Sequence, residues 1–84
     1  MRLRKADVTW QQLDDEIIIL DLNGGEYLSV NGSGAFLWKQ LDAGAEFEGL
    51  VSSLSDEYDL PRERAHDDVE AFLTQLREAG LLET

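Results

Sequence analysis

The sequence of 84 residues contains no cysteine and a single histidine, His66. Without cysteine, neither a disulfide framework nor a zinc site with thiolate ligands can form. Nucleophilic catalysis by serine usually needs a paired base. His66 could serve as a base or a metal ligand, but its place beside Asp67 on the polar side of a predicted helix favours a solvated residue. We therefore expect no catalytic, cofactor-binding or metal-binding residue, and no enzymatic activity.

Long apolar runs are also missing. No segment approaches the roughly 20 apolar residues that a membrane helix needs. The segment Ile17–Leu22 is too short, and too far from the basic N-terminus, to be the core of a secretory signal. The glycines at positions 24, 25, 32 and 34 do not have the spacing of a phosphate-binding loop. We expect a cytoplasmic protein without a membrane partner.

Basic residues are few. The sequence has seven Lys and Arg and eighteen Asp and Glu, which gives a net charge of −11. Such a surface repels nucleic acid and anionic membranes. It attracts basic peptides or proteins, although acidic residues can also serve only to keep a small domain soluble. The sequence leaves these two interpretations of the charge open.

The pattern that is present predicts a single domain over residues 1–84 that begins with three strands. Val8–Gln12, Ile17–Leu22 and Glu26–Val30 are rich in residues that favour strands. The short turns between them, including Asn23-Gly24-Gly25, predict an antiparallel meander. The middle strand is apolar on both faces, so we expect it to be central and covered on both sides. A second copy or the N-terminal segment could supply the outer cover.

Three helices are predicted to follow, giving an α+β domain of the winged helix-turn-helix-like type. The first is capped by Asn31 or Ser33 and runs to about Asp42, and the third ends near a capping Gly80. The second spans the apolar period from Phe47, and the third runs from about residue 62 to 79. The expected buried stripes are Gly34, Leu37, Trp38 and Leu41 in the first helix, Phe47, Leu50, Val51, Leu54 and Tyr58 in the second, and Ala65, Val69, Phe72, Leu73 and Leu76 in the third.

A winged helix often binds DNA, but the third helix argues against this here. A recognition helix must bring donors to bases and cations to phosphates. In the third predicted helix, acidic residues outnumber basic ones. The acidic residues are Asp67, Asp68, Glu70 and Glu78, and the basic ones are Arg62, Arg64 and Arg77. DNA binding is the least favoured of the three functions considered. An acidic module that docks on and regulates a basic enzyme is the second.

Peptide binding is the most favoured of the three functions, because the strand Glu26–Val30 is predicted to lie at a sheet edge. It has no proline or lysine to block its free backbone groups. An extended peptide could add there as a fourth strand. The pattern alone equally allows an edge that is merely short or covered by the protein's own chain.

The order of several short motifs resembles the PqqD family. Glu26–Asn31 followed by Gly34–Trp38 is similar to that family's junction between strand and helix. Asp68–Leu73, Leu76 and Ala79–Leu82 are similar to its last helix and closing Gly-Leu-Leu. The resemblance covers roughly residues 8–82. Val30, where Leu is commoner, and the glycine-rich run at 32–34 depart from the family pattern.

The resemblance implies a recognition element that holds the leader segment of a ribosomally made precursor peptide. The leader would bind as a strand added to the third strand, beside the third helix. The partner enzyme would be a radical SAM enzyme, or a leader peptidase and cyclase of a lasso-peptide pathway. The run Asn31-Gly32-Ser33-Gly34-Ala35 is slightly more similar to the lasso type.

Carried over to this sequence, the resemblance implies ten residues that bind the peptide. Phe72, Leu28 and Tyr27 are candidates to line pockets for apolar leader residues, and Asp67 and Asp68 could meet a basic one. Phe72 could instead be a core residue, and Asp68 could instead cap the helix or pair locally. Only one of Tyr27 and Leu28 can face the groove, because neighbouring strand residues point to opposite sides. Trp38 is expected in the core. The ten residues are Glu26, Tyr27, Leu28, Ser29, Val30, Asp67, Asp68, Ala71, Phe72 and Gln75.

Overall fold

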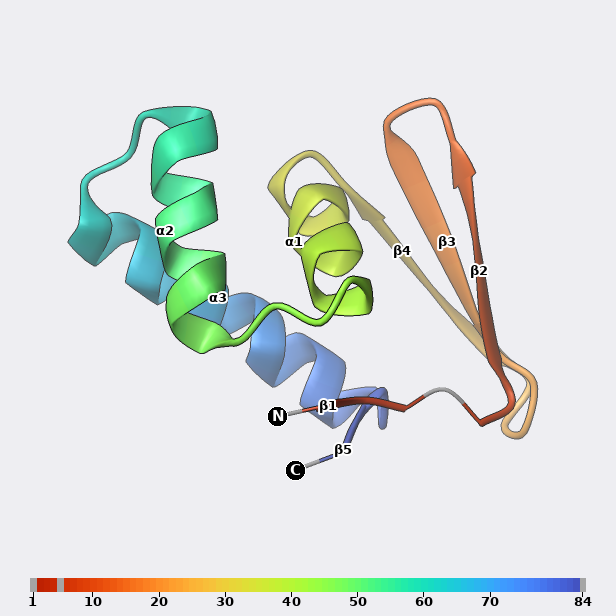
Figure 1. Ribbon diagram of the computed structural model, residues 1–84. Coiled ribbons are helices and arrows are strands. Elements are labelled where there is room, and N and C mark those ends of the chain that lie inside the picture. The colour runs from red at the N-terminus through yellow and green to blue at the C-terminus, as the bar shows by residue number, and fades with distance from the viewer. Residues whose placement is uncertain (1, 5, 84) are drawn as a thin grey trace.

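Figure 1 presents the computed structural model, which describes residues 2–4 and 6–83. The predicted order of three strands and then three helices is confirmed. A short strand at each end of the chain is added to it. The elements are β1 (Arg2–Leu3), β2 (Val8–Leu13), β3 (Glu16–Asp21), β4 (Glu26–Asn31), α1 (Ser33–Asp42), α2 (Phe47–Tyr58), α3 (Arg62–Glu78) and β5 (Leu82–Glu83).

The main sheet is an antiparallel meander with the order β2-β3-β4, so β3 is central and β4 lies at an edge. The hairpin between β3 and β4 turns at Gly25, whose φ of 72° is a conformation that glycine adopts without strain. Its N–H donates to the carbonyl of Asp21 at 2.9 Å. The predicted meander and its glycine turn are therefore confirmed.

The core lies between one face of this sheet and the helices (Figure 1). Ile17 and Ile19 of β3 point into it from the sheet and are almost fully buried. Trp38 of α1 is 1% exposed, as expected for a core residue, and the ring of Trp10 meets it edge to face with centroids 6.4 Å apart. Such an arrangement suits the quadrupoles of two aromatic rings.

Three details of the helices differ from the prediction. Neither Asn31 nor Ser33 caps α1, because Gly32, with φ of 55°, makes the turn while Asn31 stays in β4 and Ser33 begins the helix. Gly34 is only half-buried, and Ala35 takes the core position beside it. Tyr58 is 43% exposed, because it lies in the last turn of α2.

The end of the molecule away from the α2–α3 turn is held by the small β1–β5 sheet, which the sequence did not predict. Leu81 folds back onto the core, following Gly80 with its positive φ. Gly80 therefore ends α3 as predicted. Its position allows the N–H of Leu81 to donate to the carbonyl of Leu76 at 2.9 Å, which satisfies a carbonyl of the last helical turn.

Arg4 connects this end of the molecule to the β3–β4 hairpin. Its guanidinium donates to the carbonyl of Gly80 at 3.1 Å and to the carboxylate of Asp21 at 2.5 Å. The hydrogen bond from Arg4 lowers the pKa of Asp21 below its usual value; partial burial opposes this, and the backbone N–H groups of Gly24 and Asn23 assist it. Because the folded-state pKa is the lower one, this pairing stabilises the fold above the unfolded pKa and is lost as pH falls through the folded one.

The outer face of the sheet, which points away from the helices, is not covered by any residue in the ranges 2–4 and 6–83 (Figure 1). Leu20 of β3 is 41% exposed there. The expectation that the central strand is covered on both faces is therefore wrong for this chain by itself. The N-terminal segment cannot cover that face, because β1 pairs with β5 instead. No described helix is long and apolar enough to cross a membrane.

Candidate peptide-binding groove

The strand β4 has one free edge. It pairs with β3 along its whole length from Glu26 to Asn31, and no other described strand pairs with its opposite side. The backbone groups on that side are available to another chain. No proline interrupts β4, and no lysine or bulge protects it. The edge therefore has the properties that strand addition requires.

A hollow of about 510 Å³ lies between this edge and α3. Six of the ten residues predicted to bind a peptide line it. They come from one segment of β4 and from successive turns of α3, which places them on facing walls. The six are Ser29, Val30, Asp68, Ala71, Phe72 and Gln75.

The wall of this hollow at the junction of β4 and α1 is built by close packing around Gly34. A Cβ atom added to Gly34 would lie 3.3 Å from Cβ of Val30 and 3.5 Å from the ring of Phe72. The missing side chain thus lets the Phe72 ring approach the strand. Phe72 is 7% exposed, so it belongs to the core and also lines the hollow. Its position is compatible with both expected roles, and its contact with a leader residue stays a prediction.

A second hollow, of about 140 Å³, lies between the other end of β4 and the end of α3. Glu26, Tyr27 and Leu28 line it from the strand, so nine of the ten predicted residues border one of these two hollows. We refer to the two together as the β4–α3 groove. Leu28 pairs with the buried Ile19 and is half-buried on the helix side of the sheet. Tyr27 is 71% exposed, because neighbouring strand residues face opposite sides.

The groove has a different charge at each end. Near the start of α3, Asp68 pairs with Arg64 at 3.5 Å, so the local charge is balanced. Near its end, Glu26 and Glu78 line the smaller hollow, and Asp21 is already paired with Arg4. The C-terminus of a helix also carries partial negative charge. We therefore expect a basic residue of a bound peptide to be favoured at the end near Glu78.

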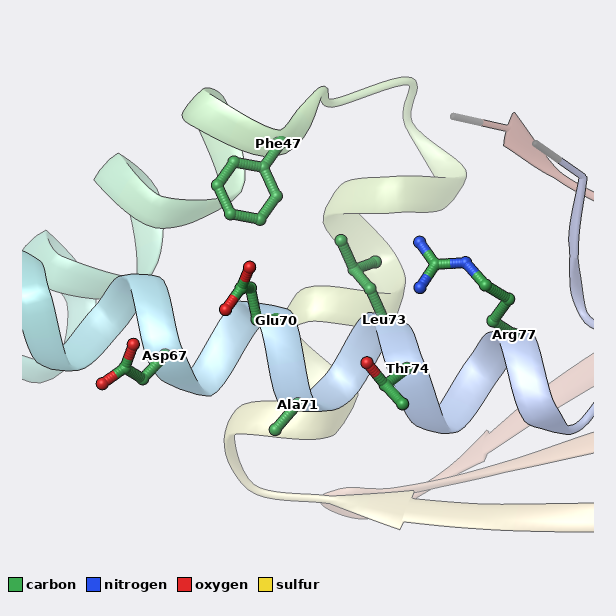
Figure 2. A pocket seen from close by; sticks show the side chains of 7 residues that line it. All are labelled: Phe47, Asp67, Glu70, Ala71, Leu73, Thr74 and Arg77. Atoms are coloured by element: carbon green, nitrogen blue, oxygen red, sulfur yellow. The ribbon is translucent and has the colours of Figure 1, made fainter.

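Asp67 does not border the β4–α3 groove. It lines a separate hollow of about 560 Å³ on the α2 side of α3, which only Ala71 among the other nine residues also borders. Figure 2 shows Phe47 and Leu73 on that side, while Ala71 points toward the side of β4. One residue along a helix turns a side chain by about 100°, which separates Asp67 from Asp68.

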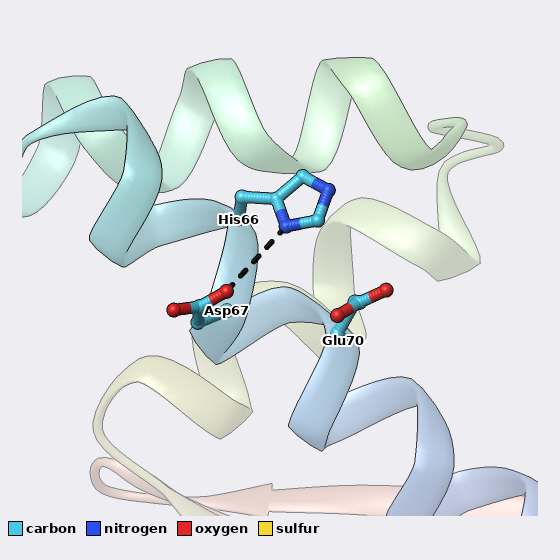
Figure 3. Close-up of side chains that lie close together, drawn as sticks. All are labelled: His66, Asp67 and Glu70. Carbon is cyan, nitrogen blue, oxygen red and sulfur yellow. Dashed lines mark ion pairs between the residues drawn. The ribbon is translucent and has the colours of Figure 1, made fainter.

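Asp67 instead forms a cluster with His66 and Glu70 (Figure 3). Their ligand atoms lie within 4.8 Å of one another, and Nδ1 of His66 is 3.7 Å from a carboxylate oxygen of Asp67. His66 is half-buried, with its ring edge-on to Phe47 at 5.1 Å, so it is less solvated than predicted. Both carboxylates face water, which satisfies them without a cation. The cluster by itself carries no site.

Several residues of the groove were missed by the sequence analysis. On α3 they are Arg64, Glu78 and Ala79, which extend the spacing of Asp68, Ala71 and Gln75 by further helical turns. This spacing of three and four, beside the buried stripe, was a usable signal. Another is Ile19, a core residue within β3. The rest lie at strand ends, before β5 or at the junction of β4 and α1, where no period exists: Asp21, Asn31, Ser33, Gly34 and Leu81.

Comparison with known structures gives two close relatives of this chain. One is described as TbiB1 in complex with the TbiA(beta) leader peptide; it is 30% identical, has a TM-score of 0.92, and the match covers 99% of this chain and 95% of that one. The other is described as lasso peptide synthetase B1 complexed with the leader peptide. It is also 30% identical, with a TM-score of 0.87 and coverage of 99% and 96%. Both relatives thus match nearly the whole fold.

The sequence pattern of one protein family matches residues 16–82, from the start of β3 into β5. That family is described as coenzyme PQQ synthesis protein D (PqqD). No curated protein matches the sequence. The match includes β4, α3 and the groove between them, and it agrees with the resemblance seen in the motifs of the strand–helix junction. The chain belongs to the PqqD family and has the fold of its precursor-peptide recognition elements.

Proposed function

We propose that this protein binds the leader segment of a ribosomally synthesised precursor peptide, which adds to β4 as a fourth strand and lies in the β4–α3 groove. The observation that carries the proposal is the free edge of β4 beside a hollow lined by α3. The leader peptides in the two related complexes support it. Backbone hydrogen bonds to residues 26–30 supply affinity, and side-chain pockets supply specificity.

In this proposal the groove selects two kinds of leader residue. Apolar side chains enter between Leu28 of the strand and Phe72 of the helix. A basic side chain is favoured most beside Glu78, and a second one beside Asp68 shares that carboxylate with Arg64. Ala71 and Gln75 present short or neutral side chains between them, which leaves room for the added backbone.

The protein then acts as an adaptor and not as an enzyme. It presents the precursor to a separate modifying enzyme, which is a leader peptidase and cyclase of the lasso type or a radical SAM enzyme. The description of one relative as a lasso peptide synthetase component favours the first. The groove residues also support the adaptor role, because they combine a free strand edge with apolar side chains, as peptide binding requires.

Two neighbouring charge reversals test the proposed position of the leader. Asp68→Lys places a cation in the groove, whereas Asp67→Lys makes the same change in the hollow on the other side of α3. We expect Asp68→Lys to weaken binding of a basic leader about fivefold, since an exposed charge pair contributes up to about 1 kcal/mol. Asp67→Lys should leave it within about twofold.

The measurement is the fluorescence anisotropy of a labelled leader peptide, with the TbiA(beta) leader bound by one relative as the first probe. Circular dichroism of both variants confirms that they remain folded. If Asp67→Lys weakens binding and Asp68→Lys does not, the peptide occupies the α2 side of α3 and the proposed groove is wrong.

A further inference from the structure

The outer face of the main sheet carries apolar side chains along its central strand, although it is in contact with water. We define it as the side chains of β2, β3 and β4 that point away from the helices, together with Leu22. An antiparallel sheet with one solvated face normally alternates apolar and polar residues. Here, four of the five exposed large apolar side chains among the described residues lie on this face: Leu13 at 50%, Leu20 at 41%, Leu22 at 63% and Tyr27 at 71%.

Strand register places most of these side chains in adjacent rows. Leu20 lies opposite Tyr27 on β4, and Ile18 lies one row along, opposite Ser29. Leu22 follows β3 directly and is held by a hydrogen bond from its N–H to the carbonyl of Asp7 at 2.8 Å. These side chains form a patch centred on Leu20 near the β3–β4 hairpin, whereas Leu13 lies at the other end of the sheet, opposite Glu16. Patches of this kind mark interaction sites on soluble proteins.

The patch is continuous with the proposed leader site. Tyr27 belongs to β4, the strand to which the leader adds. In an added strand, alternate side chains point to opposite faces of the sheet. Half of the leader side chains would therefore lie on the outer face, in a new row beside Tyr27 and Ser29. A bound leader thus enlarges this face and changes its composition.

The charges on the same face of the sheet, toward the β2–β3 turn, indicate which kind of partner fits. Asp14 and Asp15 form the turn at one end, and Glu16 lies on the outer face itself, where its carboxylate accepts a hydrogen bond from the Ser29 hydroxyl. Two copies of this chain, each with a net charge of −11, would oppose these acids to one another. A partner with an apolar patch bordered by Lys and Arg is complementary to both features.

The size of the face indicates that the leader contributes to such binding. Three strands of six residues cover roughly 300 Å², from a rise of about 3.3 Å per residue and a strand spacing of about 4.8 Å. A stable interface buries about 800 Å² per partner. The bare sheet face falls short of this, and a fourth strand adds about a third to its area.

We propose that the outer face and the outward side chains of the bound leader together form the docking surface for the enzyme that modifies the precursor. The enzyme contributes an apolar patch bordered by basic residues and binds the leader-loaded protein more tightly than the free protein. This inference rests on the proposed function. It adds a reason why β3 is apolar on both faces: its inner side chains stabilise the fold and its outer ones bind the enzyme.

The test measures binding of a purified leader peptidase of the lasso type to the immobilised full chain by biolayer interferometry. Leu20→Lys places a charge at the centre of the patch. Tyr58→Lys is its matched control, because Tyr58 is 43% exposed against 41% for Leu20 but lies on α2. Leu22→Lys provides a second variant outside any strand. Each is measured with and without saturating leader peptide.

We expect leader to tighten binding of the enzyme to the wild type about fivefold, and Leu20→Lys and Leu22→Lys to weaken it about tenfold, as for a central interface residue. Tyr58→Lys should change it less than twofold. Leader affinity should stay within about twofold in all variants, which also shows that they are folded.

The inference is overturned if the enzyme binds Leu20→Lys and Leu22→Lys as tightly as it binds the wild type. It is also overturned if the leader peptide does not change the affinity of the enzyme. A wild type that elutes as a dimer, with Leu20→Lys as a monomer, overturns it in favour of a second copy. Failure of the wild type to bind leader contradicts the proposed function instead.

Discussion

Replacing Ala71 by Trp is expected to weaken leader binding about 10- to 100-fold while leaving the protein folded. Ala71 is exposed on α3, lines the hollow of about 510 Å³ in the β4–α3 groove and points toward the side of β4 (Figure 2). An indole there fills the space that an added strand must occupy. Forcing extra atoms into a packed site costs about 1–3 kcal/mol, which is the source of the expected factor. Anisotropy of the labelled leader gives the affinity directly.

Thr74→Trp is the control for this prediction. Thr74 is also exposed on α3, one turn further on, but it lines the hollow on the α2 side (Figure 2). The added indole is the same, whereas the leader site stays open. An equal loss of leader affinity in both variants would show that an added indole disturbs α3 itself. It would then give no evidence that the leader occupies the groove.

Replacing Leu54 by Ala is expected to lower the free energy of unfolding by about 2–5 kcal/mol. Leu54 lies on α2, is fully buried, and belongs to the single core cluster. Its truncation leaves a cavity that rigid neighbours do not fill. The melting temperature should fall by at least about 10 °C, because 1 kcal/mol corresponds to about 4–8 °C in a domain of this size. Urea denaturation followed by circular dichroism measures the change.

Leu13→Ala is the matched control, since Leu13 is 50% exposed on the outer face. The same truncation there should change the free energy of unfolding by no more than about 0.5 kcal/mol. Leader affinity of folded Leu54→Ala should equal that of the wild type, because α2 does not line the β4–α3 groove. A Leu13→Ala effect as large as that of Leu54→Ala would mean that the outer face is buried in solution, as in a stable dimer.

The periodic parts of this fold could be predicted from the sequence. Alternation in Glu26–Val30 and the spacing of three and four in α2 and α3 reflect side chains that must reach one core. The glycines of the β3–β4 hairpin also predicted its turn, because glycine adopts a positive φ without strain. The β1–β5 pair could not be predicted, since two residues are too few to carry a period. Its position depends on where the two ends of the chain meet.

The groove was predictable to the extent that it follows the helical period. Asp68, Ala71, Phe72 and Gln75 share one side of α3, and the structure places them together. Asp67 was carried over together with Asp68 from the family resemblance, although the side chains of two neighbouring helix residues point in different directions. Gly34 could be identified only from three-dimensional packing, because its role depends on the ring of Phe72.

The most direct test of the central claim is amide hydrogen exchange by NMR, with and without bound leader. Strand addition forms new hydrogen bonds from the free edge of β4, so alternate amides within Glu26–Val30 should become strongly protected. The amides of α3 beyond the groove, including that of Arg77, should change little. Unchanged β4 amides in a saturated complex, together with shifts around Phe47 and Thr74, would contradict the account and place the peptide on the α2 side of α3.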